Sequence, residues 1–171
     1  MIDRLLDFLL SVFERIVPVI IVKEYDQAAL FRFGKFLRIL GPGMHFKIPV
    51  FDDPDVHTVV PTTLQLPAQS VTTKDGRQVV VKAVVKYSIA DLEVFAVKAF
   101  DAKDALSDRT CGIVFRTIRS KTWDETHDTD MNPEITKEAR REAKRWGIAV
   151  EEVTIVSYQQ MRSLRIISEK E

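Results

Sequence analysis

The residue types that carry out chemistry are scattered in this sequence, and their spacing forms no catalytic arrangement. The three histidines, His45, His57 and His127, stand in unrelated sequence contexts. A serine hydrolase needs a nucleophile beside a base, and the sequence contains no G-x-S-x-G, no H-E-x-x-H and no glycine-rich phosphate loop. We therefore expect a protein that is not an enzyme and that uses no cofactor.

Two positions contain residue types that could bind a metal or react as a thiol. The acidic neighbours of His127 are Asp124, Glu125, Asp128 and Asp130. Such a set is compatible with a metal site, but a solvated polar connection over 123–130 explains it without a ligand, so we expect no metal. Cys111 is the single cysteine and cannot form an internal disulfide. It is most simply a small core or interface residue, with palmitoylation or a redox role as the alternatives. The carboxylates of 52–55 indicate an acidic loop and no acid/base pair.

Composition indicates a folded chain and excludes several classes of protein. The 171 residues include 25 Lys and Arg against 25 Asp and Glu, and 46% are hydrophobic. A chain of this length forms one domain, or two small subdomains, and is too apolar for intrinsic disorder. Zero net charge argues against a protein that coats nucleic acid, so we expect no nucleic-acid partner.

The first 17 residues are the strongest local signal, because they predict an amphipathic helix with a wide apolar face. The apolar face consists of Ile2, Leu5, Leu6, Phe8, Leu9, Leu10, Val12, Phe13, Ile16 and Val17. Pro18 ends the helix. The segment is too short and too charged to span a bilayer and lacks the features of a signal peptide. Three alternatives follow: a helix in the membrane interface, a helix packed on its own domain, or a helix packed on a second copy. We expect the interface.

The residues up to about position 90 predict a twisted antiparallel sheet. Apolar and alternating runs indicate strands at 17–22, 28–33, 36–40 and 45–51. We expect hairpin turns at Gly34–Lys35 and at 41–43. The longest strand is expected at 77–89, with Val79, Val81, Ala83, Val85, Tyr87 and Ile89 on its buried face.

Helical spacing begins at Ala90. We expect helices at 90–100 and 101–121, and a third that begins at Asn132–Pro133 and stops before Gly147. A final strand at 148–158 completes an α+β fold.

Four segments in this order resemble the SPFH or band 7 family, which includes stomatins, prohibitins and flotillins. They are the membrane-proximal apolar segment, GPGMHFKIPVF (41–51), TKDGRQVVVKAVVKYSIAD (73–91) and WGIAVEEVTI (146–155). The residues that match the family pattern are Pro18, Gly41, Pro42, Gly43, Pro49, Asp75, Gly76, Tyr87, Trp146 and Gly147. The family's coiled coil has no counterpart before Glu171, so we expect either a minimal or truncated member or a chain that assembles through another contact.

The resemblance implies an SPFH domain at 18–158, made of a membrane-proximal β part (18–73) and an α/β part (74–158), and a short tail at 159–171. It also implies a membrane-associated scaffold without enzymatic activity, which forms homo-oligomers and organises membrane microdomains or regulates membrane proteins. The alternative is a small regulatory module that binds a membrane protease or another integral membrane protein without forming a large ring. We expect peripheral or monotopic attachment on the cytoplasmic side.

The membrane contact can be predicted more closely. Apolar residues near cations, as at Phe36–Phe51 with Lys35, Arg38 and Lys47, suit the headgroup boundary. The alternative is that these apolar residues, the phenylalanines included, form the core of the sheet. The residues that we expect to contact membrane lipid are Pro18, Met44 and Phe46, together with the apolar face of 1–17. We expect Ile39 and Ile48 in the core of the sheet.

Overall fold

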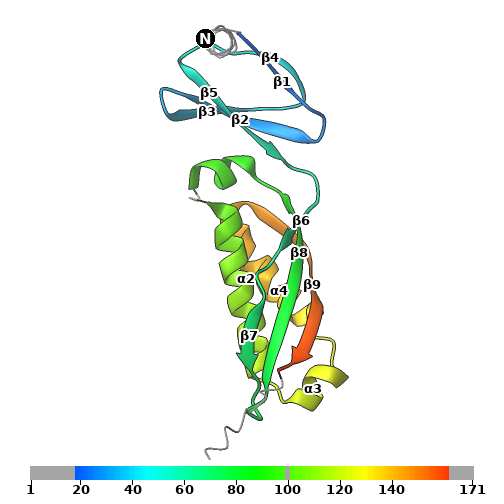
Figure 1. Cartoon of the computed structure of the whole chain (residues 1–171). Helices are drawn as coiled ribbons and strands as arrows, with labels where there is room; N and C mark the ends of the chain where they lie inside the picture. The colour runs from blue at the N-terminus through cyan, green and yellow to red at the C-terminus, as the bar shows by residue number, and fades with distance from the viewer. Residues whose placement is uncertain (1–17, 99–100, 162–171) are drawn as a thin grey trace, which may run out of the picture. The chain divides into compact units, whose positions relative to one another are not determined.

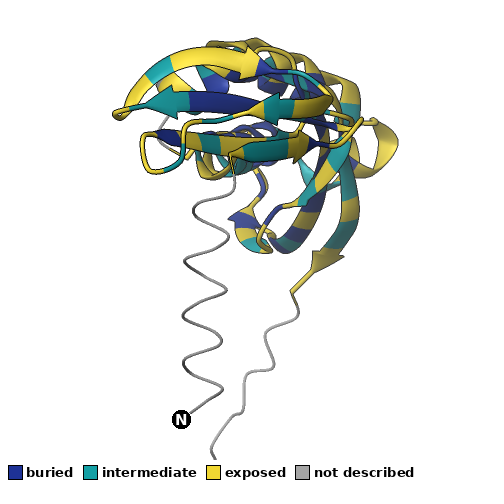
Figure 2. Ribbon diagram, turned by 90° about the horizontal axis from the view of Figure 1, so that it is seen from above, coloured by how far each residue is buried: buried dark blue, intermediate teal, exposed yellow. Residues whose placement is uncertain are grey.

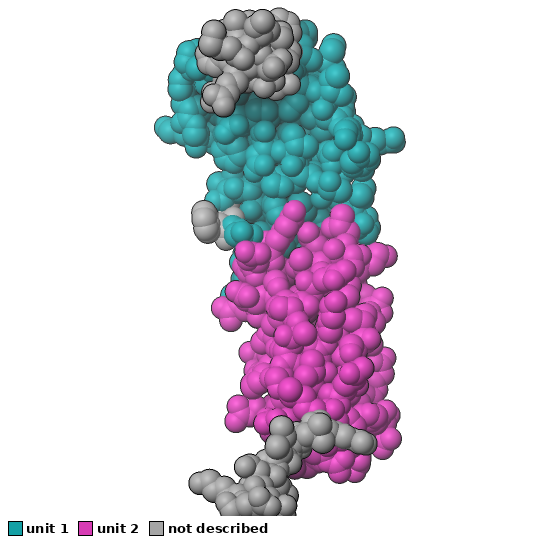
Figure 3. Space-filling model, in the orientation of Figure 1, with its two compact units in different colours: residues 1–61, 88–102, 145–148 teal, residues 62–87, 103–144, 149–171 magenta. Residues whose placement is uncertain are grey.

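The computed structural model describes residues 18–98 and 101–161, whose contacts group into two compact units (Figures 1 and 3). The first unit is made of Met1–Pro61, Ser88–Ala102 and Arg145–Ile148, and the second of Thr62–Tyr87, Lys103–Lys144 and Ala149–Glu171. Both are discontinuous in sequence, whereas the predicted division into 18–73 and 74–158 is a single cut. The predicted helix at 1–17 lies outside the described residues, as does the predicted tail beyond Met161.

Two small antiparallel sheets form the first unit. One pairs β1 (Val19–Val22) with β4 (Gly43–Phe46), and the other has the order β3 (Lys35–Leu40), β2 (Asp26–Arg32), β5 (Asp52–Thr58). Its core contains Val22, Ala28, Leu30 and Leu40, with Ile20 packed against them. These side chains come from alternate positions of short strands; the opposite face of β1 carries exposed Ile21, whereas Ala29 on the opposite face of β2 is buried.

Three sequence-based boundaries in this unit are wrong. The β2–β3 turn is Phe33–Gly34, one residue earlier than expected, because Lys35 pairs with Arg32. The expected strand 45–51 ends at Phe46. The expected loop 52–55 is the start of β5, since Asp52 is buried and β5 is an edge strand, where Pro54 is tolerated.

A four-stranded sheet is the centre of the second unit. β8 (Gln78–Ile89) pairs antiparallel on one side with β6 (Thr62–Gln65) and β7 (Gln69–Thr72), and it also pairs with β9 (Ile148–Gln160). The alternating burial of β8 confirms the predicted inward face from Val79 to Ile89. Buried, intermediate and exposed residues follow one another in bands along the strands of the chain (Figure 2).

The helices follow the predicted order with two differences. They are the π-helical segment η1 (Val94–Lys98), α2 (Ala102–Arg119), α3 (Trp123–Asp128), α4 (Asn132–Ala143) and the 3₁₀ turn η2 (Lys144–Trp146). The expected helix at 90–100 is thus only a short π-helical segment. The expected connection at 123–130 instead contains α3, because Thr122 and Glu125 form a reciprocal capping box. Antiparallel sheets followed by helices and a last strand confirm the predicted α+β class.

Side chains of α4 bond to the main chain of β9. Thr136 Oγ1 accepts from the Val153 amide at 2.9 Å, and Asn132 Oδ1 accepts from the Ile155 amide at 3.0 Å. Arg140 donates to the carbonyl oxygens of Val150 at 2.9 Å and Glu151 at 2.7 Å. Asn132, Thr136 and Arg140 are spaced by four residues and therefore share one face of the helix. This face occupies main-chain groups of β9 and so protects that edge of the sheet.

Gly147 occupies a position that only glycine fits. Its φ is +70°, and its carbonyl oxygen accepts hydrogen bonds from the Ala90 amide at 2.8 Å and the Asp91 amide at 3.0 Å. A Cβ here would lie 2.3 Å from the Asp91 carbonyl oxygen. Gly112, in the middle of α2, has open space where its Cβ would be. The Trp146–Gly147 pair of the sequence pattern therefore has a steric cause.

Candidate membrane-contacting surface

One face of the β1–β4 sheet is apolar and bare. Ile21 lies opposite Met44 and Val19 lies opposite Phe46, so these four side chains share a face. Ile21 is 74% exposed, Met44 65% and Phe46 71%. The other face carries Ile20 and Val22 into the core. The two predicted contact residues, Met44 and Phe46, are therefore brought together on one surface, and Ile21 joins them.

A second apolar group lies at the β2–β3 turn and the loop before β5. The rings of Phe33 and Phe51 are 4.9 Å apart between centroids, and the Phe33 amide donates to the Phe51 carbonyl oxygen at 3.1 Å. Phe33 is 73% exposed, and Val50, beside Phe51 in the chain, is 81% exposed. We call Ile21, Phe33, Met44, Phe46, Val50 and Phe51 the apolar surface.

The backbone of the apolar surface is strained at two of its most exposed residues. Phe33 has φ +52° and Val50 has φ +74°, in the left-handed region that bulky and β-branched residues avoid. In a two-residue turn of this type Asn, Asp or Gly is the ordinary choice. The side chains of Phe33 and Val50 gain little burial within the described structure. Both the backbone strain and the exposed apolar area are therefore unfavourable for the isolated unit. Strained residues of this kind cluster at functional sites.

Asp52 holds the loop that carries Val50 and Phe51. Its carboxylate accepts from Arg32 Nε at 2.6 Å, from Arg32 Nη2 at 3.0 Å and from the Ile48 amide at 2.7 Å. The Arg32 hydrogen bonds and then the Ile48 amide lower the pKa of Asp52 to about 2. A charged, fully bonded carboxylate at neutral pH thus fixes the loop against β2.

Apolar exposure is concentrated in this part of the molecule. Of the fifteen large apolar residues that are exposed in the described ranges, twelve lie between Ile21 and Val60. The expectation that Ile39 and Ile48 are core residues is wrong: they are 40% and 46% exposed, because the small core holds only Leu30, Leu40 and their neighbours. The side chains of the cations Lys35 and Arg38 are also exposed. The main chain at Pro18 is held to the end of β4, because the Lys47 amide donates to the Pro18 carbonyl oxygen at 2.8 Å.

The other predicted positions fall at turns and in the core. Gly41 and Pro42 connect β3 to β4, whose first residue is Gly43, and Pro49 lies in the turn that follows β4. Asp75 and Gly76 form the β7–β8 turn, Tyr87 is buried in β8, and Trp146 and Gly147 follow α4. The backbone at Gly43 and Gly76 requires positive φ, at 124° and 82°.

The profile described as SPFH domain / Band 7 family matches residues 20–161. The chain belongs to this family. An uncharacterised protein of Archaeoglobus fulgidus is 31% identical over 149 residues, 86% of this chain and 60% of the relative. A stomatin homolog of Pyrococcus horikoshii is 39% identical over 71 residues, 42% of this chain and 27% of the relative. Protein HflC of Buchnera aphidicola is 31% identical over 94 residues, 51% of this chain and 30% of the relative. This SPFH chain therefore spans only part of the length of these relatives.

Sequence reasoning named Met44 and Phe46 in this SPFH domain but did not name the equally exposed Ile21, Phe33 and Val50. The available signal was Phe33 before Gly34, an aromatic residue in a turn that favours Asn or Asp. No helix within 18–98 or 101–161 is long and apolar enough to cross a bilayer.

The residues considered for chemistry take up ordinary structural contacts. His127 lies 4.2 Å from Trp123 between ring centroids and 5.6 Å from Tyr158, and its Nδ1 is 3.1 Å from the Trp123 carbonyl oxygen. Burial raises the pKa of the Cys111 thiol. Within the described ranges, no three His, Cys, Asp or Glu residues gather as a metal site.

Proposed function

We propose that this SPFH protein is a peripheral or monotopic membrane scaffold, and that the apolar surface contacts lipid. The observation that carries the proposal is the bare face of Ile21, Met44 and Phe46, together with the exposed and strained Phe33 and Val50 of the same unit. Exposed apolar patches of this kind mark interaction sites in soluble domains. The relatives named stomatin homolog and Protein HflC support the assignment to a membrane-linked family role.

The energy of such a contact indicates why one copy alone would bind weakly. Burying a large apolar side chain fully contributes about 1.5–3 kcal/mol. Three side chains that are two-thirds to three-quarters exposed would then contribute on the order of 4 kcal/mol, in the range of marginal, reversible membrane binding. Stable attachment needs a second element. The predicted helix at 1–17 and the joining of several copies both supply one, the latter by raising the effective concentration.

Flotation with anionic liposomes tests the membrane contact. The full chain is compared with an Ile21→Thr, Met44→Gln, Phe46→Thr variant and with a deletion of residues 2–17. The matched control is Val156→Thr, Met161→Gln, which removes exposed apolar side chains from the second unit. We expect the first variant to float less than wild type and the control to float equally. Equal flotation of the wild type, the triple variant and the control would refute the role of the apolar surface. The deletion reports separately on the predicted helix at 1–17.

Assembly is the second part of the proposal. Helices α2 and α4 present mixed charges, with Arg116 bonded to Glu138 at 2.6 Å and Arg141 3.9 Å from the same carboxylate. Interspersed charges set the register between copies more than they add affinity. We propose that homo-oligomers organise a membrane region or regulate membrane proteins from the cytoplasmic side, without enzymatic activity. Mass measurement in mild detergent tests this: a monodisperse monomer would refute the scaffold and leave the small regulatory module.

A further inference from the structure

The two edges of the sheet in the second unit differ. Side chains of α4 occupy main-chain groups of β9, as described above. At the opposite edge, β7 pairs only with β8, and no described residue bonds to the outer edge of Gln69–Thr72. An open edge presents unpaired N–H and C=O groups, which are a template for another strand. β7 is therefore the edge at which a further strand can be added.

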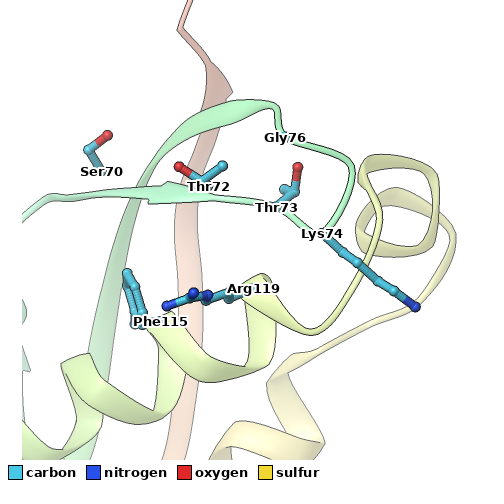
Figure 4. Close-up of a pocket in the computed structure, with 7 residues that line it drawn as sticks. All are labelled: Ser70, Thr72, Thr73, Lys74, Gly76, Phe115 and Arg119. Atoms are coloured by element: carbon cyan, nitrogen blue, oxygen red, sulfur yellow. The ribbon is translucent and has the colours of Figure 1, made fainter.

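A groove runs along this open edge. It is a cavity of about 660 Å³ lined by Ser70, Thr72, Thr73, Lys74, Gly76, Phe115 and Arg119. Figure 4 shows Ser70 and Thr72 on one side of β7, and Phe115 and Arg119 of α2 on the other. Helix α2 runs alongside the strand in the same direction, because Gln69 Nε2 bonds the Cys111 carbonyl and the Lys74 amide bonds the Lys121 carbonyl.

One stripe of α2 forms the floor on which an added strand would lie. Ser107, Cys111 and Phe115 are half-buried and Arg119 is exposed, at intervals of four residues. The Arg119 guanidinium lies 5.9 Å from the Phe115 ring centroid and forms no ion pair with any residue in the described ranges. The stripe thus offers an apolar position followed by an uncompensated positive charge.

A small anion is a poorer occupant than a strand. The amides of Thr73, Lys74, Gly76 and Arg77 already donate within the turn or to Lys121, and the Thr73 hydroxyl is bonded to Asp75 and Arg77. The Lys74 side chain points away from Arg119 (Figure 4). The groups that remain free are the edge of β7, Phe115 and Arg119.

The spacing of these groups fits a strand. Four residues of an α-helix advance about 6 Å, from Phe115 to Arg119. Two residues of a β-strand advance about 6.8 Å, and such residues face the same side. A strand added to β7 therefore places alternate side chains over Phe115 and Arg119.

We propose that the open edge of β7 binds, by strand addition, an extended segment of a partner protein in which an apolar and an acidic residue alternate with one residue between them. Main-chain hydrogen bonds to β7 supply affinity, while Phe115 and Arg119 select the apolar and the acidic side chain. This inference concerns the second unit only and does not rest on membrane contact.

The probe is the peptide acetyl-TVTETVT-amide with a neutral fluorophore, which places valine and glutamate at alternate positions in either chain direction. Binding to the full chain in mild detergent is measured by fluorescence anisotropy. Alkylation of Cys111, the only cysteine, reports independently whether the α2 stripe beside the groove is covered. Three further peptides serve as comparisons: one with glutamine for glutamate, one with lysine for glutamate, and one N-methylated at alternate amides.

We expect saturable binding of the glutamate peptide, binding about fivefold weaker for the glutamine peptide, and slower alkylation of Cys111 when the glutamate peptide is bound. The N-methylated peptide should not bind, because it cannot donate to the edge. Arg119→Gln should remove the preference for glutamate while leaving weak binding. The matched control is Arg109→Gln, an exposed arginine of the same helix, which should behave as wild type.

Several results would overturn the proposal. They are the absence of saturable binding up to millimolar peptide, equal binding of the N-methylated peptide, and a glutamate preference that survives Arg119→Gln. Cys111 that is already protected without peptide, with no peptide binding, would show that a second copy or another part of the chain covers the edge. Failure of liposome flotation would leave this proposal unaffected.

Discussion

Replacing Gly147 with alanine should be among the most destabilising single-methyl additions in the described part of the chain. The left-handed backbone at φ +70° disfavours any Cβ by about 1–2 kcal/mol. The new Cβ would also lie 2.3 Å from the Asp91 carbonyl oxygen, against an ordinary contact of about 3.5 Å. One of the two segments must then move by about 1 Å.

That movement acts on three hydrogen bonds. The Gly147 carbonyl oxygen accepts from the Ala90 and Asp91 amides, and the Asp91 carbonyl oxygen accepts from the Phe95 amide at 3.0 Å. Each bond is worth about 1 kcal/mol net, so weakening two or three of them adds about 2–3 kcal/mol. We expect Gly147→Ala to lower the free energy of unfolding by about 3–5 kcal/mol, a large part of the total stability of a typical domain.

Two other glycines provide matched substitutions. Gly76 has φ +82° but open space around its Cβ position, so Gly76→Ala should cost only about 1–2 kcal/mol. Gly112 is helical and open, so Gly112→Ala should stabilise the protein by about 1 kcal/mol. The order of the three unfolding midpoints is therefore fixed by geometry.

Urea unfolding followed by tryptophan fluorescence and circular dichroism measures these changes. Trp146 lies in the first unit and Trp123 in the second. In a Trp123→Phe background, tryptophan fluorescence therefore reports on the first unit, which contains Gly147. If Gly147→Ala shifts the midpoint no further than Gly76→Ala, the close approach to Asp91 is not the reason for glycine at this position.

Two further predictions concern single side chains. Asp52→Asn should remove a stability contribution that is present above the ordinary carboxyl pKa, near 3.8, and is lost as pH falls toward the folded pKa of about 2. The difference in urea midpoint between the variant and the wild type should therefore shrink between pH 4 and pH 2. A constant difference would contradict the Arg32 contact as its cause. Thr136→Val should lower the free energy of unfolding by about 1–3 kcal/mol, because the buried Val153 amide loses its acceptor. As a control, Thr129→Val at an exposed position should change the free energy of unfolding by less than about 0.5 kcal/mol in the same urea assay.

Periodicity predicted the parts of the fold in which burial alternates regularly. The inward face of β8 follows directly from the spacing of Val79, Val81, Ala83 and Val85, and the third helix ends before Gly147 as its residue types indicate. The resemblance to the SPFH family, which rests on four ordered segments, is confirmed by the family match over 20–161.

Contacts between residues far apart in sequence, and the small size of the first unit, explain the errors. Asp52 looks like a loop residue until Arg32 and the Ile48 amide surround it, and Ile39 and Ile48 look like core residues in a unit too small to bury them. The exposed Phe33 and Val50 break local preferences that sequence rules assume. Whether the surface they form meets lipid stays a prediction.

The contacts between α4 and β9 limit how this sheet can grow. A sheet with two free edges can add strands at both ends and extend without limit, as in fibrils. Here Asn132, Thr136 and Arg140 occupy main-chain groups of β9, whereas no described residue bonds to the outer edge of β7. If a strand is added to this sheet, we therefore expect it beside β7 and not beside 150–155 of β9. Growth from one edge favours a single added strand over a fibril.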